Sequence, residues 1–336
     1  MNDLLLEVKG LKTYFDNEDG LLKAVDDVSF YVNEGETLGV VGESGCGKSV
    51  TSLSVMQLVP QPRGRIAGGE INYYKDKNNP IDITKLKPHG KEMRNIRGND
   101  MAMIFQEPMT SLNPVYTIGE QIIEGVLIHT DKSKNQARER AIEMLELVGI
   151  SAPATRVDAY PHELSGGQRQ RAMIAIALAC DPSFLIADEP TTALDVTIEA
   201  QILKLMRDLQ DEFGMSIMFI THDLGVIGEM ADRVIVMYTG NIVEKAETKQ
   251  LYKDPQHPYT KGLLKSVPRI GRKERLVPIE GSVPNLLTLD EDQCYFASRC
   301  PQVMDKCLEK EPPTITTEEG RDVKCWLFSE KEAAIS

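Results

Sequence analysis

The chain has 336 residues with a formal net charge of −13, and 41% of its residues are hydrophobic and 26% charged. Such a length holds one large or two modest domains of ordinary soluble composition. The acidic balance argues against nucleic acid as the main partner, because a phosphate backbone requires a basic face. No apolar stretch approaches the ~20 residues that span a bilayer, and the N-terminus lacks the basic region and cleavage site of a signal peptide. We therefore expect a cytosolic protein whose association with a membrane, if any, comes through partners.

The first elements predicted are the strands of a small antiparallel sheet. Residues 4–9 and 28–33 alternate apolar and polar side chains, as half-buried strands do. Tyr14 and Phe15 stand at the expected end of the first strand. An aromatic ring upstream of a phosphate-binding loop can stack on adenine, and packing within the small sheet is an equally good interpretation for either residue alone.

A glycine-rich loop follows, between a buried strand at residues 37–41 and a helix at residues 49–58. It fits the P-loop pattern G-x-x-x-x-G-K-S/T and reads Gly42-Glu43-Ser44-Gly45-Cys46-Gly47-Lys48-Ser49. Its glycines let backbone N–H groups turn onto phosphate oxygens, and the helix N-terminus adds partial positive charge. We expect Lys48 to reach the β- and γ-phosphates of ATP, Ser49 to ligate Mg²⁺ and Val50 to complete the binding segment. Cys46 occupies a free position and has no catalytic role, and a glycine-rich turn that matches by chance is the competing interpretation.

An apolar strand at residues 101–105 ends in Gln106, after a short strand at residues 70–74. A polar side chain at the carboxyl end of such a strand lies where α/β sheets present ligands. Gln106 could therefore touch Mg²⁺ or an attacking water, although a lone glutamine carries little weight. Residues 107–163 then read as a helical insert between the sheet-forming halves.

Two segments carry the capping-box pattern that opens a helix. The first begins at Thr117, within the helical insert, and the second is the run Leu164-Ser165-Gly166-Gly167-Gln168. In the second, two glycines bare the amides of the helix N-terminus, which makes a second anion site on the same chain. As a cap alone the pattern is common, but these five contiguous residues are rare.

A buried strand at residues 184–189 ends in Asp188 and Glu189. Burying two acids is costly unless a cation or a reaction needs them. Asp188 fits a residue that holds Mg²⁺ through water, and Glu189 fits a general base that polarises the attacking water. Two solvated acids at a plain strand end are the alternative. His222 ends a further apolar strand and could hydrogen-bond the γ-phosphate and orient the water, although a lone histidine is usually structural.

The tail, residues 256–336, has little regular periodicity and many prolines, so it needs a staple. Its cysteines, spaced C-x₅-C, C-x₆-C and C-x₁₇-C, are Cys294, Cys300, Cys307 and Cys325. In a reducing cytosol such clustering suggests metal rather than disulfides. Four thiolates suffice for Zn²⁺ or for a 4Fe–4S cluster, and the spacing does not decide between them. Four free thiols are the remaining alternative.

Residues 4–255 resemble the ATPase subunits of ABC transporters, with every key motif in the family's order. The resemblance implies an α/β fold, a P-loop NTPase with a RecA-like core, an antiparallel β subdomain and a helical subdomain at about residues 107–165. A Cys-rich C-terminal extension at residues 256–336 would follow this ATPase domain. It also implies that Phe15 or Tyr14 stacks on adenine, with Phe15 the preferred candidate. The resemblance implies that Gln106 is the Q-loop glutamine and that residues 164–168 are the signature. Asp188 would be the Walker B residue and Glu189 the catalytic base. Residues 193–195, ending in Asp195, would be the D-loop, and His222 the switch histidine.

The family mechanism pairs two such subunits head to tail, so that Ser165 and Gly167 of one complete the γ-phosphate site of the other. Residues 103–114 and 254–264 resemble the dipeptide and oligopeptide importer ATPases, whose D-type subunits hold a 4Fe–4S cluster in a similar tail. The resemblance implies a peripheral ATPase on the cytoplasmic face of the membrane that energises peptide uptake. Its partners would be an F-type ATPase subunit or a second copy, two permease subunits and an extracytoplasmic peptide-binding protein. A nickel or glutathione importer ATPase, or a non-transport ABC ATPase acting on ribosomes or DNA ends, are the alternatives.

Overall fold

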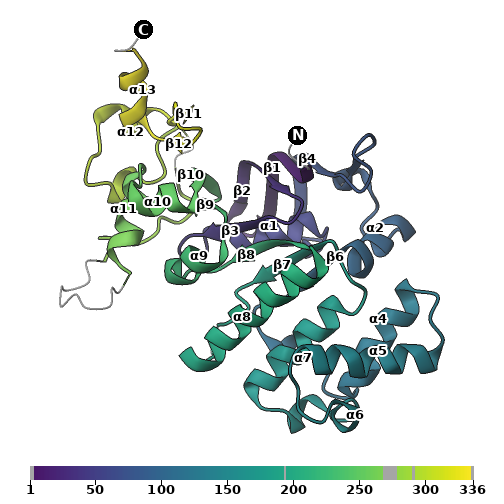
Figure 1. Ribbon diagram of the computed structural model, residues 1–336. Coiled ribbons are helices and arrows are strands. Elements are labelled where there is room, and N and C mark those ends of the chain that lie inside the picture. The colour runs from purple at the N-terminus through teal and green to yellow at the C-terminus, as the bar shows by residue number, and fades with distance from the viewer. Residues whose placement is uncertain (1–3, 193, 268–277, 290–291, 334–336) are drawn as a thin grey trace. The chain divides into compact units, whose positions relative to one another are not determined.

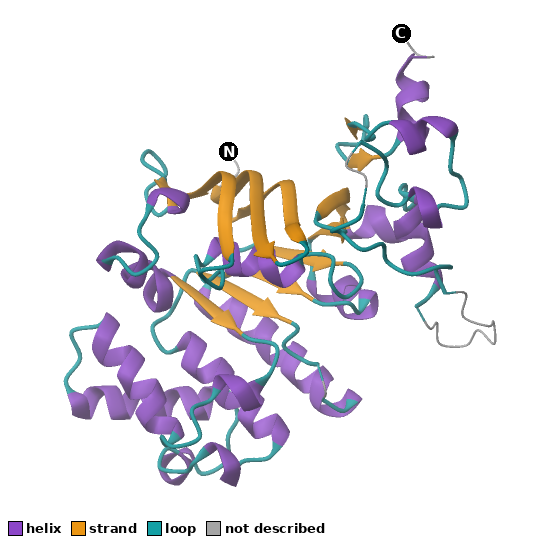
Figure 2. Ribbon diagram, turned by 180° about the vertical axis from the view of Figure 1, so that it is seen from behind, coloured by secondary structure: helices purple, strands orange, loops and turns teal. Residues whose placement is uncertain are grey.

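The computed structural model describes residues 4–192, 194–267, 278–289 and 292–333. The chain divides into two compact units. The first unit comprises residues 1–32, 37–84 and 219–336, and the second comprises residues 33–36 and 85–218. Both units combine helices with strands, as Figure 1 and Figure 2 show.

A four-stranded sheet in the order β2-β1-β4-β5 belongs to the first unit. Its strands are β1 (Leu4–Asn17), β2 (Gly20–Asn33), β4 (Gly64–Tyr73) and β5 (Ile81–Asp82). Strand β4 runs antiparallel to both β1 and β5. The two stretches with alternating side chains lie within β1 and β2, so the predicted antiparallel sheet is confirmed.

Two strands of this sheet are longer than predicted. Strand β1 continues past Tyr14 and Phe15, and β4 begins at Gly64 instead of residue 70. The alternation fails in β4 because glycines interrupt it, but the structure needs one of them. Gly69 has φ +89°, and a Cβ there would lie 2.4 Å from the carbonyl oxygen of Gly10 on the paired strand. The strand was predicted to begin only at residue 70 because glycines also occur in loops, whereas Gly69 marks a place where two strands approach closely.

A second sheet of the first unit carries the glycine-rich loop. Strand β3 (Thr37–Val41) is buried throughout and lies parallel to β9 (Arg233–Tyr238). Strand β10 (Asn241–Glu247) pairs antiparallel with β9. The loop after β3 leads into α1 (Lys48–Val55), so the predicted strand–loop–helix is confirmed. Before β9 come β8 (Ser216–Ile220) and α9 (Leu224–Met230).

The tail has more regular structure than predicted. It contains α11 (Pro258–Lys265), α12 (Asp305–Glu309), β11 (Thr314–Thr316), β12 (Asp322–Lys324) and α13 (Trp326–Ala333), after α10 (Thr248–Lys253). Strand β12 pairs antiparallel with β10, and β11 pairs with β12. The tail therefore extends the second sheet by two strands. The prediction of an irregular tail was wrong because three-residue strands are too short to show an alternating pattern.

In the second unit, β6 (Met101–Ile104) lies parallel to β7 (Phe184–Asp188). Its helices are α2 (Lys91–Asn95), α3 (Pro108–Ser111), α4 (Ile118–His129), α5 (Lys134–Leu147), α6 (Pro153–Arg156), α7 (Gly166–Leu178) and α8 (Val196–Phe213). Both predicted capping boxes are confirmed, at Thr117 before α4 and at Ser165 before α7. Helices α4, α5 and α7 pack on one another (Figure 1).

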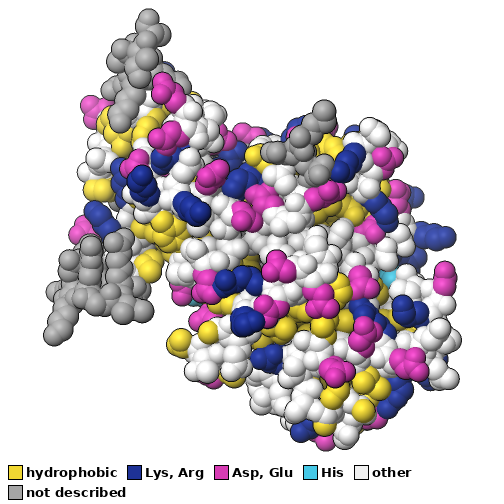
Figure 3. Space-filling model, in the orientation of Figure 1, with side chains coloured by type: hydrophobic (Ala, Val, Ile, Leu, Met, Phe, Trp, Pro, Cys, Tyr) yellow, Lys and Arg dark blue, Asp and Glu magenta, His cyan; other side chains and the backbone are white. Residues whose placement is uncertain are grey.

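Acidic and basic side chains are interspersed over the face shown in Figure 3. Across the part of the chain that the structure describes, no helix has both the length and the apolar character that a membrane crossing requires.

Candidate functional site

The phosphate loop, Gly42–Ser49, is shaped by contacts with strands of its own unit. A Cβ on Gly42 would lie 2.3 Å from the carbonyl oxygen of Met237, and one on Gly47 would lie 2.5 Å from that of Ala24. Gly47 has φ +99° and precedes the first residue of α1. Only glycine allows the backbone to pass this close and then enter the helix. The loop amides therefore stand at a helix N-terminus, where an anion is favoured.

Lys48 is buried, and its side chain folds back along the loop. Its ammonium nitrogen donates hydrogen bonds to the carbonyl oxygens of Gly42 at 2.7 Å and Glu43 at 3.1 Å. Both acceptors are neutral, so these contacts orient the ammonium without cancelling its charge. Burial raises the pKa of the neighbouring Cys46 thiol, which keeps it neutral and unreactive.

The two candidate adenine-stacking aromatics lie side by side in β1, and both are half-buried. The Tyr14 hydroxyl donates to Asp26 at 2.7 Å, and the Lys23 ammonium lies 5.7 Å from the Tyr14 ring centre. The Phe15 ring covers Gly64 on the paired strand, where a Cβ would lie 2.6 Å from Phe15 Cε1. Tyr14 therefore interacts with polar neighbours, whereas the contact of Phe15 with Gly64 is a van der Waals contact.

Three polar residues of the second unit stand at the carboxyl ends of two paired strands: Gln106 after β6, and Asp188 and Glu189 at the end of β7. Ile104 at the end of β6 is in register with Ala187 near the end of β7, so the residues that follow share one edge of the sheet. Gln106 Nε2 donates to Glu189 Oε2 at 2.9 Å. Gln106 and Glu189 are thus in contact at an edge where α/β sheets present ligands, and what they bind stays a prediction.

Glu189 has a strained backbone. Its φ is +47°, in the left-handed region that non-glycine residues seldom adopt. The Thr192 hydroxyl donates to the same carboxylate oxygen, Oε2, at 3.0 Å. Asp188, the residue before it, is buried. Strain of this kind persists only where the surroundings hold it, and it is concentrated at functional sites.

The second predicted anion site is the N-terminus of α7. Ser165 Oγ accepts from the Gln168 N–H, and Gln168 Oε1 accepts from the Ser165 N–H at 3.0 Å. The helix leaves its first amides, at Gly166 and Gly167, without intrahelical partners. A Cβ on Gly166 would meet no atom within 4 Å, so the helix end is open there, whereas a Cβ on Gly167 would lie 3.0 Å from Ile198.

Asp195 caps helix α8. Its Oδ1 accepts from the Thr197 N–H at 3.1 Å and the Ile198 N–H at 3.0 Å. The predicted D-loop also includes Ala193, which lies outside the described residues. Asp195 thus has a structural task beside the one that the resemblance implies.

His222 is exposed just past the end of β8, in the first unit. The Thr221 N–H before it donates to the carbonyl oxygen of Val40, two residues before the phosphate loop begins. The backbone next to His222 is thus paired with the strand that leads into that loop, and the role of His222 toward the γ-phosphate stays a prediction.

The four tail cysteines influence one another electrostatically. Burial, aided by the other three thiols, raises the pKa of Cys294 to about 12. Burial, with Cys300 and Cys307, raises the pKa of Cys325 to about 11. All four are free thiols. However, the described residues contain no group of three or more His, Cys, Asp or Glu side chains that could hold a metal ion. The structure gives no support to the predicted metal cluster, because the thiols are near one another without forming a ligand set.

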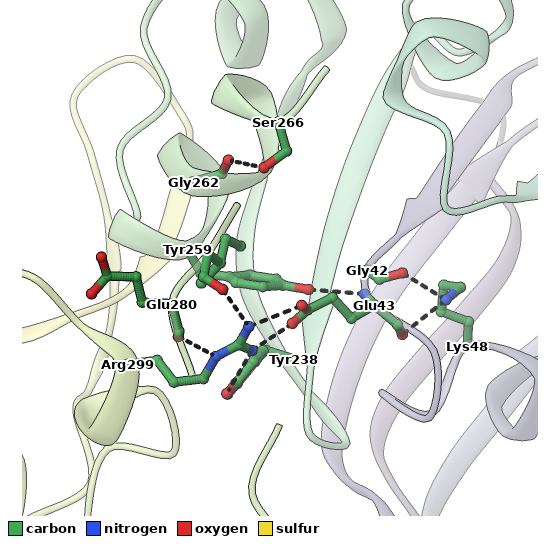
Figure 4. A network of polar contacts seen from close by, with 10 residues as sticks. Gly42, Glu43, Lys48, Tyr238, Tyr259, Gly262, Ser266, Glu280 and Arg299 are labelled. Atoms are coloured by element: carbon green, nitrogen blue, oxygen red, sulfur yellow. Dashed lines mark hydrogen bonds and ion pairs between the residues drawn. The ribbon is translucent and has the colours of Figure 1, made fainter. Parts of the chain in front are cut away.

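Sequence reasoning missed a network that joins the tail to the phosphate loop (Figure 4). Arg299 makes a double ion pair with Glu43, and Tyr259 accepts a hydrogen bond from the Glu43 N–H at 2.9 Å. These partners stand 256 and 216 residues from Glu43 in the chain. No local pattern carries such a signal.

Comparison with known proteins identifies the family. Residues 25–192 match the family described as ABC transporter, and residues 243–307 match the family described as Oligopeptide/dipeptide transporter, C-terminal region. The chain belongs to the ABC transporter family. The predicted resemblance is therefore confirmed, and the second match lies over the tail and the last ATPase strand.

Several relatives match nearly the whole chain. Oligopeptide transport ATP-binding protein AppD of Bacillus subtilis is 53% identical over 330 residues, which cover 98% of each chain. Oligopeptide transport ATP-binding protein OppD of the same organism is 50% identical over 96% of this chain and 89% of its own. Dipeptide transport ATP-binding protein DppD, also from Bacillus subtilis, is 48% identical over 97% and 96%.

Solved ABC cassettes share the fold. The dimeric, post-hydrolysis structure of the ATP-binding cassette MJ0796 with ADP and Pi has a TM-score of 0.63 and 27% identity, covering 73% of this chain and 99% of that one. The cbiO1 cassette from Clostridium perfringens has a TM-score of 0.61 and 26% identity, covering 75% and 92%. The predicted α/β P-loop NTPase fold of the ABC ATPase is confirmed.

Proposed function

We propose that this chain is the ATP-hydrolysing subunit of an ABC importer for di- and oligopeptides. The observation that supports hydrolysis most is Glu189, a carboxylate held in a strained conformation by Gln106 and Thr192 at a ligand-presenting sheet edge. The peptide substrate is supported by the match of residues 243–307 and by the printed names of relatives near 50% identity. That match favours peptides over nickel as the transported substrate.

The residues have separate tasks in this proposal. The loop amides from Gly42 to Val50 and the Lys48 ammonium bind the ATP phosphates, and Phe15 stacks on adenine. By the family resemblance, Ser49, Gln106 and Asp188 would be the residues that hold Mg²⁺, which would neutralise charge on the β- and γ-phosphates. Glu189 accepts a proton from water as the water oxygen bonds to the γ-phosphorus, and His222 orients that water. The bond from the γ-phosphorus to its bridging oxygen breaks, leaving ADP and phosphate.

A second ATPase subunit completes the site. The open N-terminus of α7, with Ser165, Gly166, Gly167 and Gln168, binds the γ-phosphate held by the partner, and Asp195 lies at the same interface. The partner is an F-type ATPase subunit or a second copy of this chain. The pair acts on two permease subunits at the cytoplasmic face of the membrane, which an extracytoplasmic peptide-binding protein supplies.

The test replaces Glu189 in the assembled transporter. Glu189→Gln should lower steady-state ATP hydrolysis and peptide uptake by about 100-fold or more while ATP binding persists, since general base catalysis contributes 10²–10⁴-fold. Glu139→Gln, an exposed carboxylate on α5, is the matched control and should keep full turnover. Wild-type turnover by Glu189→Gln would contradict the assignment of the base.

We also propose that the tail cysteines bind a 4Fe–4S cluster. The support for this proposal is the resemblance of the tail to that of peptide-importer D-type subunits, and the matched segment, residues 243–307, includes Cys294, Cys300 and Cys307. Iron, sulfide and zinc are measured in protein purified without oxygen. About four irons and four sulfides per chain are expected. Zinc alone would replace the cluster by a zinc staple, and no metal would leave four structural thiols.

A further inference from the structure

The tail contacts the phosphate loop through one buried arginine. The Arg299 side chain is 3% exposed. Its Nη1 donates to Glu43 Oε2 at 2.6 Å and its Nη2 donates to Glu43 Oε1 at 3.0 Å, a two-pronged pair that fixes the carboxylate in its plane (Figure 4). Its Nε donates to the carbonyl oxygen of Glu280 at 3.1 Å, and its Nη1 also reaches the Tyr238 hydroxyl at 3.4 Å. The guanidinium is therefore held from both sides.

The main chain of Glu43 is held as firmly as its side chain. The Glu43 N–H donates to the Tyr259 hydroxyl at 2.9 Å. Tyr259, on α11, is fully buried. The centroid of its ring lies 4.6 Å from that of Tyr238 and 5.4 Å from that of Phe296. The aromatic packing leaves the Tyr259 hydroxyl little freedom, so it sets the position of the Glu43 amide.

Glu43 in turn holds the phosphate-binding lysine. Its carbonyl oxygen accepts from the Lys48 ammonium at 3.1 Å, and the carbonyl oxygen of Gly42 accepts from it at 2.7 Å. A continuous set of contacts thus runs from Arg299 and Tyr259, through Glu43, to Lys48. Position 43 is a free position of the P-loop pattern, so phosphate binding does not itself demand a glutamate there.

We propose that Arg299 and Tyr259 are positioning residues for the phosphate loop, through which the tail sets the affinity of the ATP site. The proposal rests on the proposed binding of ATP by this loop. An ion pair with one buried partner contributes little net stability against apolar replacements, so we infer that the effect of this pair is to hold one geometry. The geometry held here is that of Glu43, and with it the ammonium of Lys48.

The experiment is a double-mutant cycle with nucleotide binding as the readout. In the full-length chain, Glu43→Gln, Arg299→Met and the double variant are compared by the Kd for ATP, and by KM and kcat in the assembled transporter. Each single variant should raise Kd and KM about tenfold with kcat little changed. The double variant should be no worse than either, since the effects of two residues that act through one contact are not additive. Tyr259→Phe should raise Kd by a smaller factor.

Arg321→Met is the matched control. Arg321 is a buried tail arginine that bonds the carbonyl oxygen of Asp254 and the carboxylate of Glu319 instead of the loop. It should lower Tm and leave Kd and KM unchanged. If Glu43→Gln and Arg299→Met lower Tm but keep the wild-type Kd and KM, the pair is structural and the proposal is wrong. If the wild type binds no ATP, the proposed function fails as well, so the two failures are distinguishable.

Discussion

At the residue scale, Glu189, the proposed general base, has an unfavourable backbone conformation. Its φ of +47° costs about 1 kcal/mol or more in any residue with a Cβ, whereas glycine adopts it freely. We therefore expect Glu189→Gly to be more stable than Glu189→Ala by about 1 kcal/mol, the reverse of their order at ordinary positions. Chemical denaturation of both variants measures the difference. A less stable glycine variant would show that the conformation carries no strain.

At the scale of single elements, glycine in β4 supports the paired strand β1. A methyl group on Gly69 would lie 2.4 Å from the carbonyl oxygen of Gly10, and the backbone of Gly69 has a left-handed conformation. Gly69→Ala should therefore lower the free energy of unfolding by about 2 kcal/mol. Its neighbour Gly68 is the control, since a Cβ there would lie 3.7 Å from a flexible Lys12 side chain. Gly68→Ala should change stability by less than about 0.5 kcal/mol. Equal effects in thermal denaturation would refute the strand-approach argument.

The first turn of α11 depends on a neutral histidine. His257 caps the helix: its ring Nδ1 accepts a hydrogen bond from the backbone N–H of Tyr259 at 3.1 Å. The backbone N–H of His257 donates to a carboxylate oxygen of Glu244 at 2.8 Å. Burial, with the charge of Lys261, lowers the pKa of His257 to about 3. The unfolded chain, with a histidine pKa near 6.5, therefore binds more protons than the folded chain between pH 6.5 and 3. Stability from this group is complete above pH 6.5 and is lost as pH falls through that window.

His257→Asn tests this pH dependence. Asparagine keeps a cap acceptor but does not titrate. The variant should show a flatter fall of Tm between pH 6.5 and 4.5 than the wild type. Parallel Tm curves would assign the acid sensitivity to another group. Glu244 works in the opposite direction, because burial raises its pKa, and it is present in both proteins.

Local chemistry decided which elements could be predicted from the sequence. The capping boxes at Thr117 and Ser165 involve residues three apart, so the pattern and the structure coincide. The edge formed by Gln106 and Glu189 followed from a rule about parallel strands. The contact of Arg299 with Glu43 follows no such rule, because tertiary packing alone brings these residues together across the chain.

At the scale of the whole molecule, one chain carries a phosphate loop and a separate helix end that we propose binds the partner's γ-phosphate. If two copies can pair, Glu189→Gln should trap the pair with ATP, because binding persists while hydrolysis is blocked. We expect twice the monomer mass of 37.4 kDa in ATP and the monomer mass in ADP. Light scattering after size exclusion measures both.

The control for this pairing adds a blocking side chain at the open end of α7. The control variant carries Gly166→Arg together with Glu189→Gln. A Cβ at position 166 has no atom within 4 Å, so the fold should be preserved while the arginine side chain covers the helix end. It should remain a monomer in ATP. A monomer in both proteins would instead mean that this chain requires a different ATPase subunit as its partner.

The attachment of Glu43 to Arg299 has a consequence for the newly made chain. The ribosome releases the phosphate loop 256 residues before the arginine that holds it. At roughly 5–20 residues per second, that interval is on the order of tens of seconds. The phosphate loop also lacks its contact with β9 until that strand has been translated, because the carbonyl group of Met237 in β9 packs against Gly42. On the proposed role of Arg299, a nascent chain would bind ATP at full strength only after translation has passed residue 299.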